Sequence, residues 1–204
     1  MKRLAIFVSG SGTNMDNLIK EIQAGRIPEA QTALVICDNP AAGAIEKAKK
    51  RNVPLVLVER SKFASKPEFE AAMIRHLESN KIDFIALAGF MKILSADFVH
   101  RFPGRIINIH PSLLPAFPGG HSIRDAFEAR AKETGVTVHF VDAGVDTGPV
   151  IIQKKVLIDP KDTLETLEAK IHSAEYELYP EALRLVISGK VRLPKHDSDT
   201  WTND

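Results

Sequence analysis

The chain alternates short apolar, β-branched runs with longer stretches in which apolar residues recur at helical spacing. The first run, Leu4–Val8, is apolar at every position, which is typical of a strand covered on both faces. After the glycines that follow it, helical spacing continues until Gly25. The same pattern predicts further strands at 32–37, 53–58, 84–88, 105–110, 136–141 and 150–157, and further helices at 41–50, 67–78, 95–101, 122–133 and 163–187.

This order of elements predicts βαβ units and therefore an α/β fold. We expect a doubly wound, mostly parallel, Rossmann-like sheet, with the last two strands as an antiparallel addition near the C-terminal part. Ser95 is expected to cap the short helix after it, and Pro180 is expected to kink or break the long last helix. A length of 204 residues without repeats or linkers predicts a single domain over 1–204, whose polar tail at 194–204 is expected to fray, with Trp201 as its candidate anchor.

Composition narrows the classes of function. The 27 Lys and Arg against 26 Asp and Glu leave a net charge of +1, so no overall field attracts nucleic acid or an anionic membrane. The single cysteine, Cys37, excludes an intramolecular disulfide and any multi-cysteine metal site. No His, Asp or Glu cluster has metal-ligand spacing, and no apolar run has the length of a signal peptide core or a membrane helix. We therefore expect a cytoplasmic protein without a metal.

A glycine-rich turn, Ser9–Asn14, joins the first strand to the first helix. A dinucleotide-binding fingerprint would require a third glycine where Met15 stands, and the lysine of a Walker A loop is also missing. Two interpretations remain open: an anion site at the free N–H groups of the helix start, or a tight turn capped by Thr13 or Asn14. The strand–turn–helix context favours the anion, most simply a phosphate.

The fifth predicted strand ends in two polar residues. Because side chains alternate along a strand, Asn108 and His110 share one face, whereas Ile107 and Ile109 share the other. Pro111 confines His110 to extended geometry. An amide beside an imidazole at the carboxyl end of a central strand can stabilise an oxyanion that forms on a carbonyl, and the imidazole can move a proton. The alternative is that nearby backbone groups satisfy both side chains, but their pairing at a strand end favours a functional role.

A carboxylate that could orient this imidazole is available in the loop at 142–148, between the last two strands. Asp142 and Asp146 are equal candidates on spacing alone. Thr137 and His139 share a strand face and either line the same cleft or are satisfied inside the protein. His121 is expected to begin a helix. The other histidines have no partner spacing and are interpreted as surface or structural residues: His76, His100, His172 and His196.

At these residues the chain resembles the glycinamide ribonucleotide formyltransferases, enzymes of purine synthesis and one-carbon metabolism that use 10-formyltetrahydrofolate. The matching segments follow the order of the family along nearly the whole chain: 9–14, 86–95, 108–115, 135–141 and 146–151. The 108–115 segment, Asn-Ile-His-Pro-Ser-Leu-Leu-Pro, is highly specific to folate formyl transfer. Methionyl-tRNA formyltransferases and formyltetrahydrofolate hydrolases share it, but each carries an additional domain for which we expect no room here.

The resemblance implies Asn108, His110 and Asp146 as the catalytic set, and so chooses Asp146 from the two loop acids. It implies that the ribonucleotide phosphate binds at Gly12, Thr13 and Asn14, and that Glu175 meets the glycinamide portion. The pterin cleft is implied at the 142–146 loop, and the folate-binding residues are Lys66, Met91, Lys92, Ile93, Leu94 and Asn108. Lys66 and Lys92 stand where the family is expected to have Arg, and Gly120 stands where a bulky aliphatic residue is commoner.

The implied reaction is direct attack of the ribonucleotide amine on the formyl carbon. Asn108 and protonated His110 stabilise the oxyanion, Asp146 supports the charged imidazole, and His110 or an ordered water carries the proton. Small-molecule partners only, and a monomer or homodimer, are expected. Two alternatives stay open: a formyltetrahydrofolate hydrolase and a non-catalytic nucleotide-binding module.

Overall fold

The computed structural model describes residues 1–193, so the predicted tail at 194–204 and its anchor Trp201 lie outside the described residues. Within 1–193, seven strands form one sheet in the order β3-β2-β1-β4-β5-β6-β7. The five strands from β3 to β5 pair in parallel, whereas β6 and β7 are antiparallel additions, as predicted. The strands are β1 (Lys2–Val8), β2 (Ala30–Cys37), β3 (Leu55–Leu57), β4 (Phe84–Leu87), β5 (Ile106–His110), β6 (Glu133–Phe140) and β7 (Val150–Leu157).

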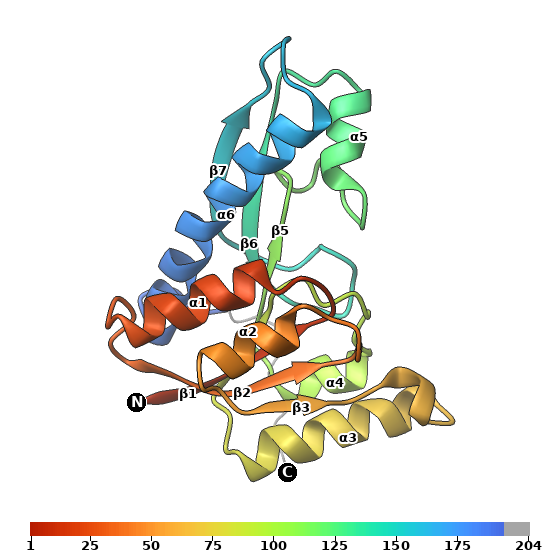
Figure 1. Cartoon of the computed structure of the whole chain (residues 1–204), viewed down its shortest axis with the longest axis vertical. Coiled ribbons are helices and arrows are strands. Elements are labelled where there is room, and N and C mark those ends of the chain that lie inside the picture. The colour runs from red at the N-terminus through yellow and green to blue at the C-terminus, as the bar shows by residue number, and fades with distance from the viewer. Residues whose placement is uncertain (194–204) are drawn as a thin grey trace, which may run out of the picture.

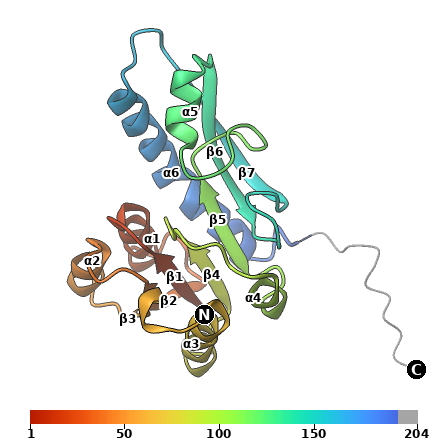
Figure 2. The same ribbon diagram turned by 90° about the vertical axis from the view of Figure 1, so that its right-hand side faces the viewer.

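Helices cover both faces of the sheet (Figures 1 and 2). The α-helices are α1 (Thr13–Gln23), α2 (Ala44–Lys50), α3 (Lys66–Ser79), α4 (Ala96–Arg101), α5 (Ser122–Glu128) and α6 (Leu164–Ile187), with a short 3-10 helix η1 (Arg60–Lys62). Buried side chains of α1, α2 and α6 pack on one face, and those of α3 and α4 pack on the other. The doubly wound α/β architecture predicted from the sequence is therefore confirmed.

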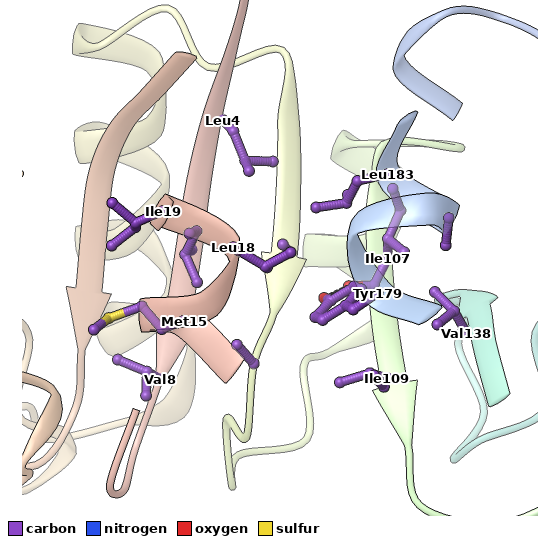
Figure 3. Close-up of a cluster of buried hydrophobic side chains, with 14 of the residues drawn as sticks. Leu4, Val8, Met15, Leu18, Ile19, Ile107, Ile109, Val138, Tyr179 and Leu183 are labelled. Carbon is purple, nitrogen blue, oxygen red and sulfur yellow. Dashed lines mark hydrogen bonds between the residues drawn. The ribbon is translucent and has the colours of Figure 1, made fainter. Parts of the chain in front are cut away.

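The larger core lies between the sheet and helices α1 and α6 (Figure 3). Met15, Leu18 and Ile19 of α1 meet the β1 side of the sheet, and Tyr179 and Leu183 of α6 meet the β5 side. Every residue of Leu4–Val8 is buried, as its uninterrupted apolar run predicts. A sheet buried on both faces leaves the ends of its strands as the places where polar side chains can meet a ligand.

Several predicted boundaries were wrong, among them the strand predicted at 136–141, which spans Glu133–Phe140, and two of the differences have a clear local cause. The helix predicted at 122–133 ends at Glu128, because Arg130 adopts a positive φ of 50° and turns the chain into β6. The helix predicted from residue 41 begins at Ala44, because the Asn39 side chain accepts a hydrogen bond from the Ala41 N–H and holds a turn there. The strand predicted at 53–58 is shortened to Leu55–Leu57.

Pro180 does not break α6, which runs continuously from Leu164 to Ile187. A proline inside a helix removes the N–H that the carbonyl four residues earlier needs, and here that carbonyl belongs to Tyr176. The Asn17 amide of α1 donates a hydrogen bond of 2.8 Å to the Tyr176 oxygen. A side chain of the neighbouring helix thus replaces the lost donor and ties α1 to α6.

Tyr179 connects α6 to the strands that carry the candidate chemistry. Its hydroxyl donates to the carbonyl oxygens of Leu87 in β4 and Ile107 in β5, at 2.9 and 3.1 Å. Burial raises the pKa of the Tyr179 phenol well above its ordinary value of 10, so the hydroxyl remains a neutral donor. The carboxyl end of β4 is thus joined to β5 at Ile107, the residue before Asn108.

We predict that Asn17→Ala lowers the free energy of unfolding by about 1–2 kcal/mol, because the Tyr176 carbonyl then loses its replacement donor. Urea denaturation measures this loss. The control is the Pro180→Ala background, in which residue 180 regains its N–H and donates to Tyr176. There Asn17→Ala should cost less than about 0.5 kcal/mol. An equal cost in both backgrounds would show that Asn17 does not act through this carbonyl.

Candidate active site

A cavity of about 560 Å³ lies at the carboxyl ends of the central strands. The chain passes from β1 outward to β2 and β3 and then returns to β4 on the opposite side of β1, so β1 and β4 form the point at which the winding reverses. Crevices at such points are the usual ligand sites of open α/β sheets. The cavity is lined by the turn after β1, the segment after β4, the end of β5, the loop after β6, and the face of α6 around Glu175.

The turn after β1 requires a glycine at position 12, just before α1 begins. Gly12 is the N-cap of α1 and has a φ of 71°, and a Cβ there would lie 2.7 Å from the Cβ of Ala44. The alternative prediction of a cap by Thr13 or Asn14 was wrong, because no side chain caps this helix. Its first N–H groups therefore remain for a ligand, as an anion site requires.

Asn108 and His110 line the cavity from one face of β5, whereas Ile107 and Ile109 lie in the core on the other face. The alternation predicted along this strand is thus confirmed. In the antiparallel pairing with β6, His139 stands opposite Asn108 and Thr137 stands opposite His110. His139 also lines the cavity, but Thr137 is buried beneath the loop that follows β5.

The two ring nitrogens of His110 have different surroundings. Nε2 lies 2.9 Å from the Phe117 carbonyl oxygen and 3.0 Å from the Ser122 hydroxyl. The carbonyl can only accept, and the hydroxyl gives its own proton to Gly119, so Nε2 must carry a hydrogen. Nδ1 lies 3.4 Å from a carboxylate oxygen of Asp146. This geometry accommodates a doubly protonated ring, in which both N–H groups face acceptors.

His139 fixes the orientation of the Asn108 amide. Nδ1 of His139 lies 2.8 Å from the Phe140 carbonyl oxygen, which requires a hydrogen on Nδ1. Burial lowers the pKa of the His139 imidazole, so the ring is neutral and its Nε2 is an acceptor. The Asn108 amide nitrogen, 3.2 Å away, donates to this Nε2. One of the two amide N–H groups of Asn108 then remains for a ligand.

The two acids of the 142–148 loop have different roles in the structure. Asp146, with a positive φ of 55°, places one carboxylate oxygen toward His110 and accepts a hydrogen bond of 2.9 Å from the Gly119 N–H. Asp142 instead accepts hydrogen bonds from Gly144 and Thr147 within its own loop. Of the two carboxylates that the sequence left as equal candidates, the one beside the imidazole belongs to Asp146.

Glu175 of α6 forms the far wall of the cavity. Its side chain is buried, and it accepts hydrogen bonds from Asn14 at 3.0 Å and from Nδ1 of His172 at 2.8 Å. His172, which the sequence analysis left as a surface or structural residue, therefore lines the cavity. Its spacing of three residues from Glu175 on one helix was the signal that could have identified it.

The segment after β4 provides an apolar rim. Met91 is 69% exposed and Ile93 is 64% exposed, whereas Leu94 is buried. Lys92 also lines the cavity and lies 3.7 Å from the carboxylate of Asp38. Lys66 is the one predicted site residue that does not line the cavity, and its ammonium lies 3.8 Å from the Glu70 carboxylate instead.

The sequence model of the formyl transferase family matches residues 2–183. The chain belongs to the formyl transferase family. A phosphoribosylglycinamide formyltransferase of Bacillus subtilis is 42% identical to this formyl transferase over 187 residues, which cover 92% of this chain and 95% of the relative.

Two further relatives agree with this assignment. The crystal structure of glycinamide ribonucleotide transformylase 1 from Geobacillus kaustophilus matches this formyl transferase with a TM-score of 0.89 and 48% identity, covering 92% of this chain and 99% of that chain. The trifunctional purine biosynthetic protein adenosine-3 of Drosophila pseudoobscura pseudoobscura is 44% identical over 192 residues, which cover 94% of this chain and 14% of that longer protein. The similarity therefore spans more than nine-tenths of the chain.

Within residues 1–193, no group of three or more His, Cys, Asp and Glu side chains is arranged to hold a metal ion. None of the helices in the described part of the chain combines the length and apolar character that crossing a membrane requires.

We predict that the imidazole of His172 titrates above its ordinary pKa of 6.5, because the hydrogen bond to Glu175 stabilises its charged form. The resulting contribution to folding is fully present below the unfolded pKa and is lost as the pH rises through the raised folded pKa. An NMR titration of the His172 ring measures this, and Glu175→Gln should lower the midpoint. The exposed His100 is the internal control, and its titration curve should be the same in both proteins. An unchanged His172 midpoint in the variant would contradict the assignment.

Proposed function

We propose that the chain is a phosphoribosylglycinamide formyltransferase, which transfers the formyl group of 10-formyltetrahydrofolate to the amine of glycinamide ribonucleotide in de novo purine synthesis. The observation that carries this proposal is the convergence of Asn108, His110 and Asp146 beside the open N-terminus of α1 in one cavity. The named relatives, 42–48% identical over nine-tenths of the chain, support the same reaction. The buried, unpaired Cys37 is consistent with the reducing cytoplasm as its location.

The proposed nucleotide site begins at the glycine turn. The phosphate binds to the free N–H groups of Gly12, Thr13 and Asn14, where the helix dipole adds a favourable partial charge. Glu175, which Asn14 and His172 hold in place, contacts the glycinamide portion. Holding the substrate at both ends brings its amine to the formyl carbon and lowers the entropic cost of the reaction.

The oxyanion that forms on the formyl carbon is stabilised by Asn108 and His110. Asn108 contributes the amide N–H that His139 leaves unused. His110 contributes a positive charge, which the nearby carboxylate of Asp146 supports. Because Nε2 of His110 is engaged by Phe117 and Ser122, we assign the exchangeable proton to Nδ1.

The bond changes follow from this arrangement. The amine nitrogen attacks the formyl carbon and gives a tetrahedral oxyanion. As the bond to the folate nitrogen breaks, that nitrogen takes up a proton and the former amine loses one, which yields the formylated amide and tetrahydrofolate. Nδ1 of His110, next to Asp146, is the group of this chain that relays the proton.

The folate donor lies against the segment Met91–Leu94 and the loop at 142–146, mainly through backbone groups. The exposed Met91 and Ile93 supply apolar contact area at the rim of the cavity. Lys92, held beside Asp38, and Lys66, at the start of α3, supply cations for the acidic tail of the donor. Their single ammonium groups give point charges in place of the bidentate contact that an arginine makes.

The first test is a spectrophotometric assay of the folate product with and without glycinamide ribonucleotide. We expect product to form only when the ribonucleotide is present, because the amine is the attacking group. Rapid formate release that does not need the ribonucleotide would favour the hydrolase instead. Binding of the nucleotide without any turnover would favour the non-catalytic module.

The second test replaces the carboxylate next to His110. Asp146→Asn should keep the fold and lower kcat about a hundredfold or more, because the charged imidazole loses its counter-ion. Steady-state kinetics at pH 7 measure the loss, and circular dichroism checks the fold. Asp142→Asn is the matched control in the same loop and should lose far less, since Asp142 bonds only within that loop. Equal losses in the two variants would remove the specific role of Asp146.

A further inference from the structure

The loop at 111–121, between β5 and α5, holds both members of the catalytic pair. Its Phe117 carbonyl accepts the hydrogen bond from Nε2 of His110, and its Gly119 N–H donates to the carboxylate of Asp146. The loop contains no helix or strand, and its internal bonds are one from the Ala116 N–H to the Leu113 carbonyl and one from the Ser112 hydroxyl to the Ala116 carbonyl. The position of the pair therefore depends on whatever fixes this loop.

One residue of the loop has an unfavourable backbone conformation. Phe117 has a φ of 52°, in the left-handed region that residues with large side chains rarely adopt. Such a conformation persists only where the surrounding structure enforces it. The carbonyl that this residue presents to His110 thus requires contacts from outside the loop.

A hydroxyl beneath the loop anchors it at residues 112 and 114, before Phe117. Thr137 of β6 donates to the Ser112 carbonyl at 2.7 Å and accepts from the Leu114 N–H at 3.1 Å and from the Gln153 amide at 2.9 Å. A hydroxyl has one donor and two acceptor sites, so all of its hydrogen-bonding capacity is used here. Thr137 bonds the N–H of Leu114 but not its carbonyl, which needs a donor from another residue.

Gln153 of β7 completes this network. Its amide nitrogen donates one hydrogen to Thr137 and the other to the Leu114 carbonyl, which lies 2.9 Å away. His110, Thr137 and Gln153 stand opposite one another on β5, β6 and β7, so the three side chains share one face of the sheet. The edge strand thus reaches the loop that surrounds the imidazole.

A close side-chain contact holds the same part of the loop. Leu113 packs over Gly135 of β6, where an added Cβ would lie 2.6 Å from the Leu113 side chain. This contact lies beside the bonds of Thr137 and Gln153 and leaves the loop little freedom at 112–114. Beyond that point, the carbonyl of Phe117 and the N–H of Gly119 are positioned by the anchored end of the loop.

We propose that Gln153 is a positioning residue for formyl transfer: its amide fixes the loop at Leu114 and so keeps His110 and Asp146 in reacting geometry. This inference rests on the function proposed above. Gln153 lies away from the nucleotide and folate contacts, so its loss should affect kcat and leave the KM of each substrate within about twofold.

The decisive variant is Gln153→Glu, which preserves the size of the side chain and replaces its donor by an oxygen. That oxygen then faces the Leu114 carbonyl and a Thr137 hydroxyl whose hydrogen is already used, so both bonds are lost. Gln153→Ala removes the same bonds without a new charge. The control is Lys155→Ala. Lys155 is the next exposed residue on the same face of β7, and its ammonium pairs only with Glu133.

Steady-state kinetics should give a kcat about tenfold lower in both Gln153 variants than in Lys155→Ala, with both KM values within twofold of wild type. A kcat within twofold of the control overturns the proposal. If Gln153→Ala does not fold, Gln153→Glu decides, because it leaves the packing volume unchanged.

A second readout does not depend on turnover. In protein labelled with ¹⁵N-histidine, the hydrogen on Nε2 of His110 should exchange with water faster in Gln153→Glu than in Lys155→Ala, because the Phe117 carbonyl is no longer held against it. Unchanged exchange would contradict the positioning role even if kcat falls. If the wild-type protein does not formylate the ribonucleotide, the proposed function fails, and this exchange rate still tests the role of Gln153.

Discussion

The hydrogen bond from Nε2 of His110 to the Phe117 carbonyl, in the loop at 111–121, is the interaction on which the proposed chemistry of this site depends. Because Phe117 accepts from Nε2 and the Ser122 hydroxyl donates elsewhere, Nε2 keeps its hydrogen in every protonation state. The ring can then change its charge only at Nδ1, beside Asp146. In the proposed reaction, this loop contact therefore leaves Nδ1, the ring nitrogen beside Asp146, as the atom of His110 that can exchange a proton.

The sheet explains why these polar groups lie where they do. Its central strands are covered by helices on both faces, so a polar side chain in their middle would be buried without water. Asn108 and His110 stand at the end of β5, where each finds partners in neighbouring segments. Tyr179 bonds both Leu87, the last residue of β4, and Ile107, the residue before Asn108, so one side chain supports both strands below the site.

Much of this arrangement could be predicted from local patterns. The uninterrupted apolar run of Leu4–Val8 predicts a buried strand, and alternation along β5 predicts which side chains face the cavity. Features decided by distant contacts could not be predicted. Spacing alone leaves Asp142 and Asp146 equal, because the Gly119 N–H that bonds Asp146 is far away in sequence. The end of α5 at Glu128 depends on Arg130, a left-handed residue that is not glycine, for which the sequence carries little signal.

The proline in α6 has a consequence for substrate selection. Asn17 bonds the carbonyl that Pro180 leaves free, and Asn14, one turn earlier on α1, bonds Glu175, the neighbour of Tyr176. These two contacts fix α1 and α6 in a single relative register. The distance between the start of α1 and the Glu175 carboxylate is thus set by two helices. If the nucleotide binds as proposed, this spacing limits the length of the substrate that fits, whereas the loops carry the reacting groups.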